Sequence, residues 1–214
     1  MKTYADSKEF FFALKDYDYV ILRNFESFPV ELCKDSHPDI DILCRNSKKL
    51  AEQVGLVNRR GYHDQVHYIV EIDGINVDVD LRSVGDGYYD RKWEETILKT
   101  KVVHKELFYV PNLENYFYSL LYHALVQKLV VSEDYKLKLR DMAVKLGLDS
   151  YFDYKKTLNN YMRENDYVYT YPNSVKTRFN ETNIDKGMVE KNVLKKTKRK
   201  VYGIFSAIRR KING

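Results

Sequence analysis

Aspartates recur at alternate positions in two short apolar stretches of the chain. The first stretch is Asp39-Ile40-Asp41-Ile42-Leu43, and the second runs from Ile75 to Arg82 and contains Asp78 and Asp80. In a strand, alternate side chains point to the same face, so each stretch predicts one apolar face and one acidic face. If the two strands are neighbours, the carboxylates gather on one surface and repel each other unless a cation neutralises them.

Two interpretations of this acidic surface are open. Magnesium shared between carboxylates and substrate phosphates is the common functional arrangement. An antiparallel sheet with one solvated face would show the same alternation without any bound ion.

The elements around the aspartates predict a small mixed α/β unit. We expect a helix over 5–15, a strand over 19–22, a loop over 24–38, the first aspartate strand, and a helix over 48–58 that ends near Gly61. The dipeptide Asp73-Gly74 between two alternating runs predicts a hairpin of 67–72 with 75–81.

The second half of the chain is predicted to be mainly helical. Helices are expected over 90–100, 113–131, 135–146 and 150–163, with two short strands in 101–110. The fold class that this order predicts is α/β (α+β), a small mixed sheet followed by helices. We expect three regions: an α/β core over 1–110, a helical subdomain packed on it over 111–180, and a basic tail over 186–214.

Three segments together resemble the nucleotidyltransferase superfold, which is the polymerase-beta-like fold. They are Val20-Ile21-Leu22-Arg23-Asn24-Phe25, Pro38-Asp39-Ile40-Asp41-Ile42-Leu43 and Val77-Asp78-Val79-Asp80-Leu81-Arg82. The resemblance covers roughly residues 17–146 and is closest to bacterial nucleotidyltransferase-like proteins. It is more distant to the fukutin and choline-phosphotransferase group.

The resemblance implies which carboxylates would act. Asp39 and Asp41 match the metal-binding pair of the superfold, and Asp80 matches its third carboxylate, with Asp78 as the second choice. These residues would hold Mg²⁺ (or Mn²⁺) at a nucleotide donor, either a triphosphate or a CDP-linked compound.

One departure from the superfold concerns the turn after its first strand. The glycine-containing turn is replaced by Arg23-Asn24, so Arg23 would contact phosphate through its guanidinium, or would be a plain surface charge. In the helix that faces the site in this superfold, His123 and Lys128 would line a phosphate pocket, although a hydrogen-bonded core histidine is the commoner case.

Charge is unevenly distributed along the chain. From Lys186 onwards there are ten basic residues and one acidic residue, a net charge of +9, which leaves 26 basic and 30 acidic residues, net −4, in the rest. A nucleic-acid-binding body would normally be the basic part, so this distribution disfavours nucleic acid as a partner.

Several classes of protein are disfavoured by composition. No apolar run approaches the roughly 18 residues of a membrane-spanning helix. The N-terminal residues also lack the basic segment followed by an apolar segment that is typical of a secretory signal. Cys33 and Cys44 have no metal-binding or redox spacing. We therefore expect a cytoplasmic protein, with peripheral contact at the inner face of the membrane.

The membrane expectation comes from the tail. After Lys195–Lys200, apolar residues recur at helical spacing at Val201, Ile204, Phe205, Ile208 and Ile212, and three basic residues follow Ile208. An apolar stripe with basic flanks is typical of a helix that lies on an anionic membrane. A helix docked on the body, a solvated tail and an RNA-binding tail are the alternatives.

The function expected from these features is a magnesium-dependent nucleotidyl- or phosphotransferase. An acceptor hydroxyl would attack a nucleotide-activated phosphate, and the tail favours a glycan or sugar acceptor in surface-polysaccharide biosynthesis, such as a capsule or teichoic-type polymer. A non-catalytic binding module of the same fold and an RNA-modifying nucleotidyltransferase are the alternatives.

Overall fold

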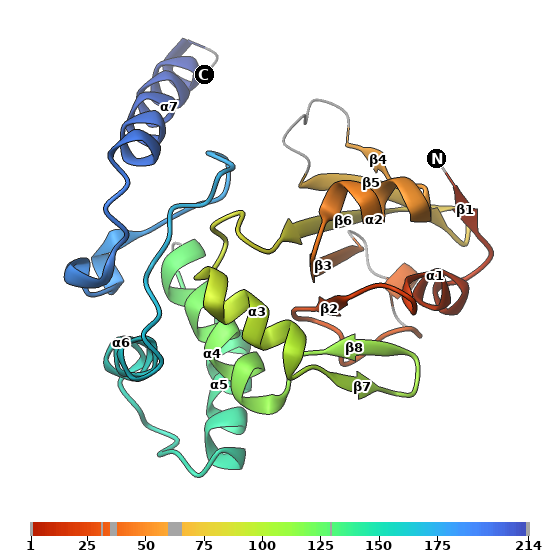
Figure 1. Cartoon of the computed structure of the whole chain (residues 1–214), viewed down its shortest axis with the longest axis horizontal. Helices are drawn as coiled ribbons and strands as arrows, with labels where there is room; N and C mark the ends of the chain where they lie inside the picture. Colours follow the sequence, from red (N-terminus) through yellow and green to blue (C-terminus); the bar gives the residue numbers. More distant parts are fainter. Residues whose placement is uncertain (1, 31, 35–37, 60–65, 129, 213–214) are drawn as a thin grey trace.

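The computed structural model describes residues 2–30, 32–34, 38–59, 66–128 and 130–212. Within these residues the protein is an α/β protein (Figure 1), with a six-stranded mixed sheet in the N-terminal half and seven α-helices, most of them in the second half. The expected fold class is confirmed at this level.

The sheet places the two aspartate strands side by side. Its strands are β1 (Thr3–Tyr4), β2 (Tyr19–Ile21), β3 (Asp39–Cys44), β4 (Val57–Asn58), β5 (His67–Ile72) and β6 (Ile75–Ser83). Their order is β1-β5-β6-β3-β2, with β4 paired to β5. β3 and β6 are parallel, so Asp39 is opposite Asp78 and Asp41 is opposite Asp80.

The hairpin predicted from Asp73-Gly74 joins β5 to β6. Both turn residues have positive φ, 53° at Asp73 and 70° at Gly74, as a two-residue hairpin turn of this kind requires. The register that follows pairs His67 with Asp80, which brings a third strand to the acidic surface.

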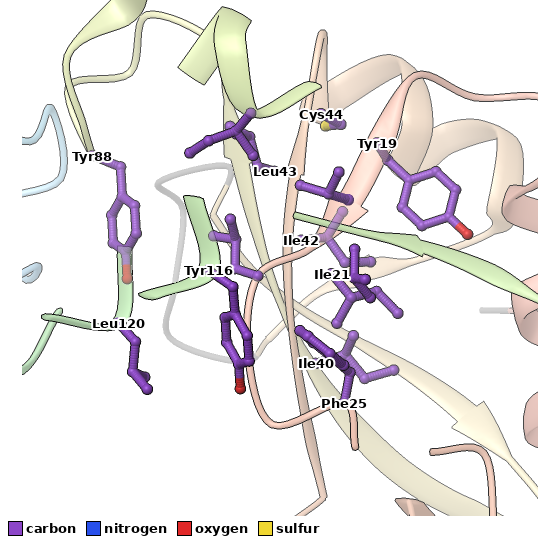
Figure 2. Close-up of a cluster of buried hydrophobic side chains, with 14 of the residues drawn as sticks. Tyr19, Ile21, Phe25, Ile40, Ile42, Leu43, Cys44, Tyr88, Tyr116 and Leu120 are labelled. Atoms are coloured by element: carbon purple, nitrogen blue, oxygen red, sulfur yellow. The ribbon is translucent and has the colours of Figure 1, made fainter. Parts of the chain in front are cut away.

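The apolar faces of β3 and β6 form the centre of the core. Ile40, Ile42, Val79 and Leu81 are completely buried, as the alternation predicted. Figure 2 shows the cluster around β2 and β3, in which residues of these strands lie with side chains from α4 (Leu113–Tyr122).

The remaining helices are α1 (Ser7–Leu14), α2 (Ser47–Val54), α3 (Arg91–Lys99), α5 (Glu133–Lys145), α6 (Tyr154–Glu164) and α7 (Val193–Ile212). Two short strands, β7 (Val102–His104) and β8 (Phe108–Val110), form a separate antiparallel pair. No helix in the described part of the chain is both long enough and apolar enough to span a bilayer.

Two predicted helices end earlier than expected. The helix expected over 48–58 ends at Val54, because Gly55 adopts φ 70° and a β-carbon there would lie 2.4 Å from the β-carbon of Lys2. β4 follows instead. The helix expected over 113–131 is α-helical only to Tyr122 and continues as a π-helical turn, His123–Gln127.

A segment between α6 and α7 packs against the loop after β6 and against the π-helical turn. Asn173 donates its backbone N–H to the carbonyl of Asp86, and Asn180 donates to that of Val126. We call residues 172–178 of this segment the strap. It brings residues that are distant in the sequence to the carboxyl-terminal end of β6.

Candidate functional site

A cavity of about 280 Å³ lies where the acidic surface meets the strap and the π-helical turn. Its lining residues are Arg23, Asn24, Asp39, Asp41, His67, Asp80, Arg82, Tyr88, His123, Gln127, Lys128, Tyr135, Lys176, Thr177 and Arg178. Of the eight candidate site residues predicted from the sequence, the structure brings seven to this cavity; Asp78 is the exception.

The carboxylates at the cavity differ in their surroundings. Asp41 is buried, whereas Asp39 is exposed at the start of β3. Burial raises the pKa of Asp80, and the negative charge of Asp41 raises it further. Asp41 and Asp80 are therefore a pair of neighbouring carboxylates whose repulsion favours a bound cation or a proton.

Asp78 belongs to a different environment. Its Oδ2 lies 2.7 Å from Nη1 of Arg59, and it does not line the cavity. This geometry favours Asp80 over Asp78 as the third carboxylate of the candidate site.

Arg23 is buried against the carboxylates. Its Nη2 lies 2.5 Å from Oδ1 of Asp41, and its Nη1 donates a 3.0 Å hydrogen bond to the hydroxyl of Tyr88. Burial opposes the charged form, but the negative charge of Asp41 raises the pKa of Arg23 well above its usual value. The interpretation of Arg23 as a surface charge is wrong.

Asn24 takes the backbone conformation that glycine usually provides. Its φ is 59°, in the left-handed region that asparagine tolerates better than most side chains. Asn24 thus supplies the backbone conformation of the glycine that is missing after β2, although its side chain lies at the cavity wall.

Arg82 is held between the sheet and the strap. Its guanidinium carbon lies 4.3 Å from the ring centroid of Tyr88, and its Nη1 donates a 3.1 Å hydrogen bond to Oγ1 of Thr177. Nη2 lies 3.6 Å from Oδ2 of Asp80. Its buried Nε has no hydrogen-bond partner among the described residues, so this cavity-lining cation has donor capacity left for an anion.

The π-helical turn presents His123 and Gln127 together. Nδ1 of His123 lies 2.7 Å from Oε1 of Gln127, and we assign the imidazole proton to Nδ1 because this oxygen only accepts hydrogen bonds. Within the described part of the chain, Nε2 of His123 and Nε2 of Gln127 have no partner. Burial, followed by the charge of Arg23, lowers the pKa of His123 well below its usual value, so the ring is neutral and its Nε2 is a free acceptor.

The carboxylates fit magnesium only in combination with a substrate. No group of three or more His, Cys, Asp or Glu side chains among the described residues is arranged to hold a metal ion. Magnesium is commonly held by one or two carboxylates together with substrate phosphates and water, rather than by a complete protein cage. Asp41 and Asp80, adjacent on parallel strands at one cavity, match that limited donor set.

Several cavity residues were not predicted from the sequence. Gln127 lies four residues after His123, a spacing that places both on one side of a helix, and this signal was available. Lys176, Thr177 and Arg178 carried no signal, because the strap has neither a motif nor a periodic pattern.

Comparisons with protein-family models, curated proteins and solved structures find no match for this chain. A functional proposal for this chain therefore rests on the geometry of the cavity. That geometry combines three carboxylates with five cationic side chains, which are Arg23, Arg82, Lys128, Lys176 and Arg178.

Proposed function

We propose that the protein is a magnesium-dependent transferase of the nucleotidyltransferase type, acting on a nucleotide-activated phosphate. The observation that supports this most is the meeting of Asp39, Asp41 and Asp80 with five cations in one cavity. Carboxylates alone would suit a simple cation site, and cations alone would suit a simple anion site. Both together suit a metal ion that arrives with a phosphate-bearing ligand.

The chain's own residues would bind the donor. Arg82 comes from β6 and Lys128 directly follows the π-helical turn, while the strap contributes Lys176 and Arg178. Arginine forks can bind two phosphate oxygens at once, while lysine acts as a point charge. These cations would neutralise the charge that builds up on the transferred group and on the leaving nucleotide or pyrophosphate.

Asp41 and Asp80 would hold Mg²⁺, with Asp39 at the exposed edge. The ion would lower the pKa of the acceptor hydroxyl and stabilise the leaving group. His123 would accept a hydrogen bond from that hydroxyl through its free Nε2, which orients an oxygen lone pair for attack on phosphorus. The acceptor oxygen would form its bond to phosphorus as the bond from phosphorus to the leaving oxygen breaks, and the proton of the hydroxyl would pass to Nε2 of His123.

Arg23 has two roles in this proposal. Without ligand it neutralises Asp41, so the buried carboxylate is not left unpaired. With Mg²⁺ held by Asp41, Arg23 would no longer be needed to neutralise this carboxylate, and its guanidinium would contact phosphate. The acceptor that we propose is a sugar or glycan hydroxyl.

The test uses two aspartates of the same strand. Wild-type protein, Asp80→Asn and the matched control Asp78→Asn are screened by thermal unfolding with nucleoside triphosphates and CDP-linked compounds, with and without Mg²⁺. We expect a ligand that stabilises wild type and Asp78→Asn only when Mg²⁺ is present. A ligand at about 100 times its Kd stabilises by roughly 2.7 kcal/mol.

Asp80→Asn should lose the magnesium-dependent part of this shift. A shift that persists in Asp80→Asn but disappears in Asp78→Asn would move the site along the same face of β6, towards Asp78 and Arg59. If no compound stabilises a cooperatively unfolding wild-type protein, the transferase proposal is wrong.

The Arg23–Asp41 ion pair supports a second candidate, a non-catalytic binding module of this fold. In that case the guanidinium would replace the metal ion permanently, and anionic ligands would bind to the remaining cations. Stabilisation by nucleotides to the same extent with and without Mg²⁺, and unchanged in Asp80→Asn, would favour this module.

A further inference from the structure

The helix α7 is attached to the body by its polar side. Nη1 of Arg199 donates hydrogen bonds of 3.1 Å to the carbonyl of Pro172 and 3.0 Å to that of Ser174. Nη2 of Arg199 bonds the carbonyl of Thr177. A single guanidinium thereby connects α7 to three carbonyls of the strap.

Two lysines on the first turns of α7 add to this attachment. Nζ of Lys195 donates a 2.9 Å hydrogen bond to the carbonyl of Tyr171 and lies 3.4 Å from Oε1 of Glu190. Nζ of Lys196 lies 3.7 Å from Oε2 of Glu181. Lys195 and Arg199 are one turn apart, so they define the side of the helix that faces the body.

The apolar side of α7 points away from this attachment. With 3.6 residues per turn, Leu194, Val201, Ile204 and Phe205 share a face opposite Arg199. Leu194 is 84 % exposed, Ile204 61 % and Phe205 67 %. A helix docked to complete the core would bury this stripe, whereas α7 contacts the body through its polar side and leaves the stripe exposed.

Charge identifies the partner that would cover the stripe. α7 contains eight basic residues and no acidic residue, and Lys198 and Lys200 beside the stripe are exposed. Two copies of α7 packed through their stripes would bring these cations together without an acidic partner on either helix. RNA would use the cations but would leave four large apolar side chains in water.

We propose that α7 lies on an anionic membrane surface, with Leu194, Val201, Ile204 and Phe205 inserted between lipids and the flanking lysines against the headgroups. An amphipathic helix of this kind lies in the interface and does not span the bilayer. In Figure 1, α7 projects from one end of the molecule, beyond the segment that follows α6.

The first test is co-sedimentation of the full chain with vesicles. One set is phosphatidylcholine alone, and the other is phosphatidylcholine mixed with phosphatidylglycerol. We expect binding to the anionic vesicles that weakens as salt is raised. Equal binding to both sets, or no binding to either, would overturn the proposal.

Two matched pairs of variants locate the contact. Phe205→Asp should weaken vesicle binding at least tenfold, as expected for loss of a buried phenyl ring. Phe12→Asp removes a phenylalanine on α1 that is 60 % exposed and should bind as wild type does. Lys200→Gln should weaken binding roughly fivefold, whereas Lys48→Gln, on α2, should have no effect.

Two further measurements separate the competing partners. Size-exclusion chromatography would reveal a dimer abolished by Phe205→Asp, and a mobility shift at physiological salt would reveal RNA binding. Either result together with absent vesicle binding overturns the membrane proposal. None of these readouts depends on the cavity, so failure here leaves the transferase proposal standing, and the converse also holds.

Discussion

Arg23 and Asp41 form an ion pair, 2.5 Å between Nη2 and Oδ1, in which both side chains are more than nine-tenths buried. The pair joins the turn after β2 to β3 at the wall of the cavity. A buried charge that loses its partner is costly, whereas replacing both partners by apolar groups costs far less.

A double-mutant cycle tests this relationship. Arg23→Leu and Asp41→Leu should each lower the free energy of unfolding by about 3–5 kcal/mol, because each leaves one buried charge unpaired. The double variant should lose less than the sum of the two. Urea unfolding of the four proteins measures this, and strict additivity would show that the pair does not interact in solution.

The positive φ of Asn24 gives a second prediction. Asn24→Gly and Asn24→Ala both remove the amide that bonds Tyr135, so the difference between them reports the backbone alone. We expect the alanine variant to be less stable than the glycine variant by about 1–2 kcal/mol. Equal midpoints in urea would mean that the turn has relaxed to negative φ.

The neutral His123 predicts how stability changes with pH. The pKa of His123 is lowered in the folded protein, so the unfolded chain takes up a proton that the folded chain does not. Its contribution to stability is complete above pH 6.5, the ordinary pKa of the side chain, and is lost as pH falls below that value. For one proton the slope is at most about 1.4 kcal/mol per pH unit.

Urea unfolding of wild type and His123→Gln checks this between about pH 7.5 and about pH 5, an interval that brackets the ordinary histidine pKa. The variant should lose less stability over this interval than wild type does. Parallel curves would place the source of the pH dependence in other groups.

The sequence predicted the acidic surface because strand alternation is a local property. Asp39, Asp41 and Asp80 could be assigned to one face without knowing what covers it, and the Asp73-Gly74 turn fixed one of the strand pairings. Whether the two aspartate strands are neighbours, and in which direction they pair, was left open by the sequence; the structure pairs β3 with β6 in parallel.

Features that depend on distant contacts were not accessible from the sequence. The burial of Arg23 requires the hydroxyl of Tyr88, which is 65 residues away. The strap is brought to the cavity by Arg199 and by the Arg82–Thr177 bond, which spans 95 residues.

The hydrogen bonds from Arg199 to the strap also connect α7 to the cavity. Thr177 carries the carbonyl that Arg199 bonds and the hydroxyl that Arg82 bonds, so one residue links α7 to the cavity wall. With α7 resting on a bilayer, the cavity would stand at a set height and orientation above the lipid headgroups.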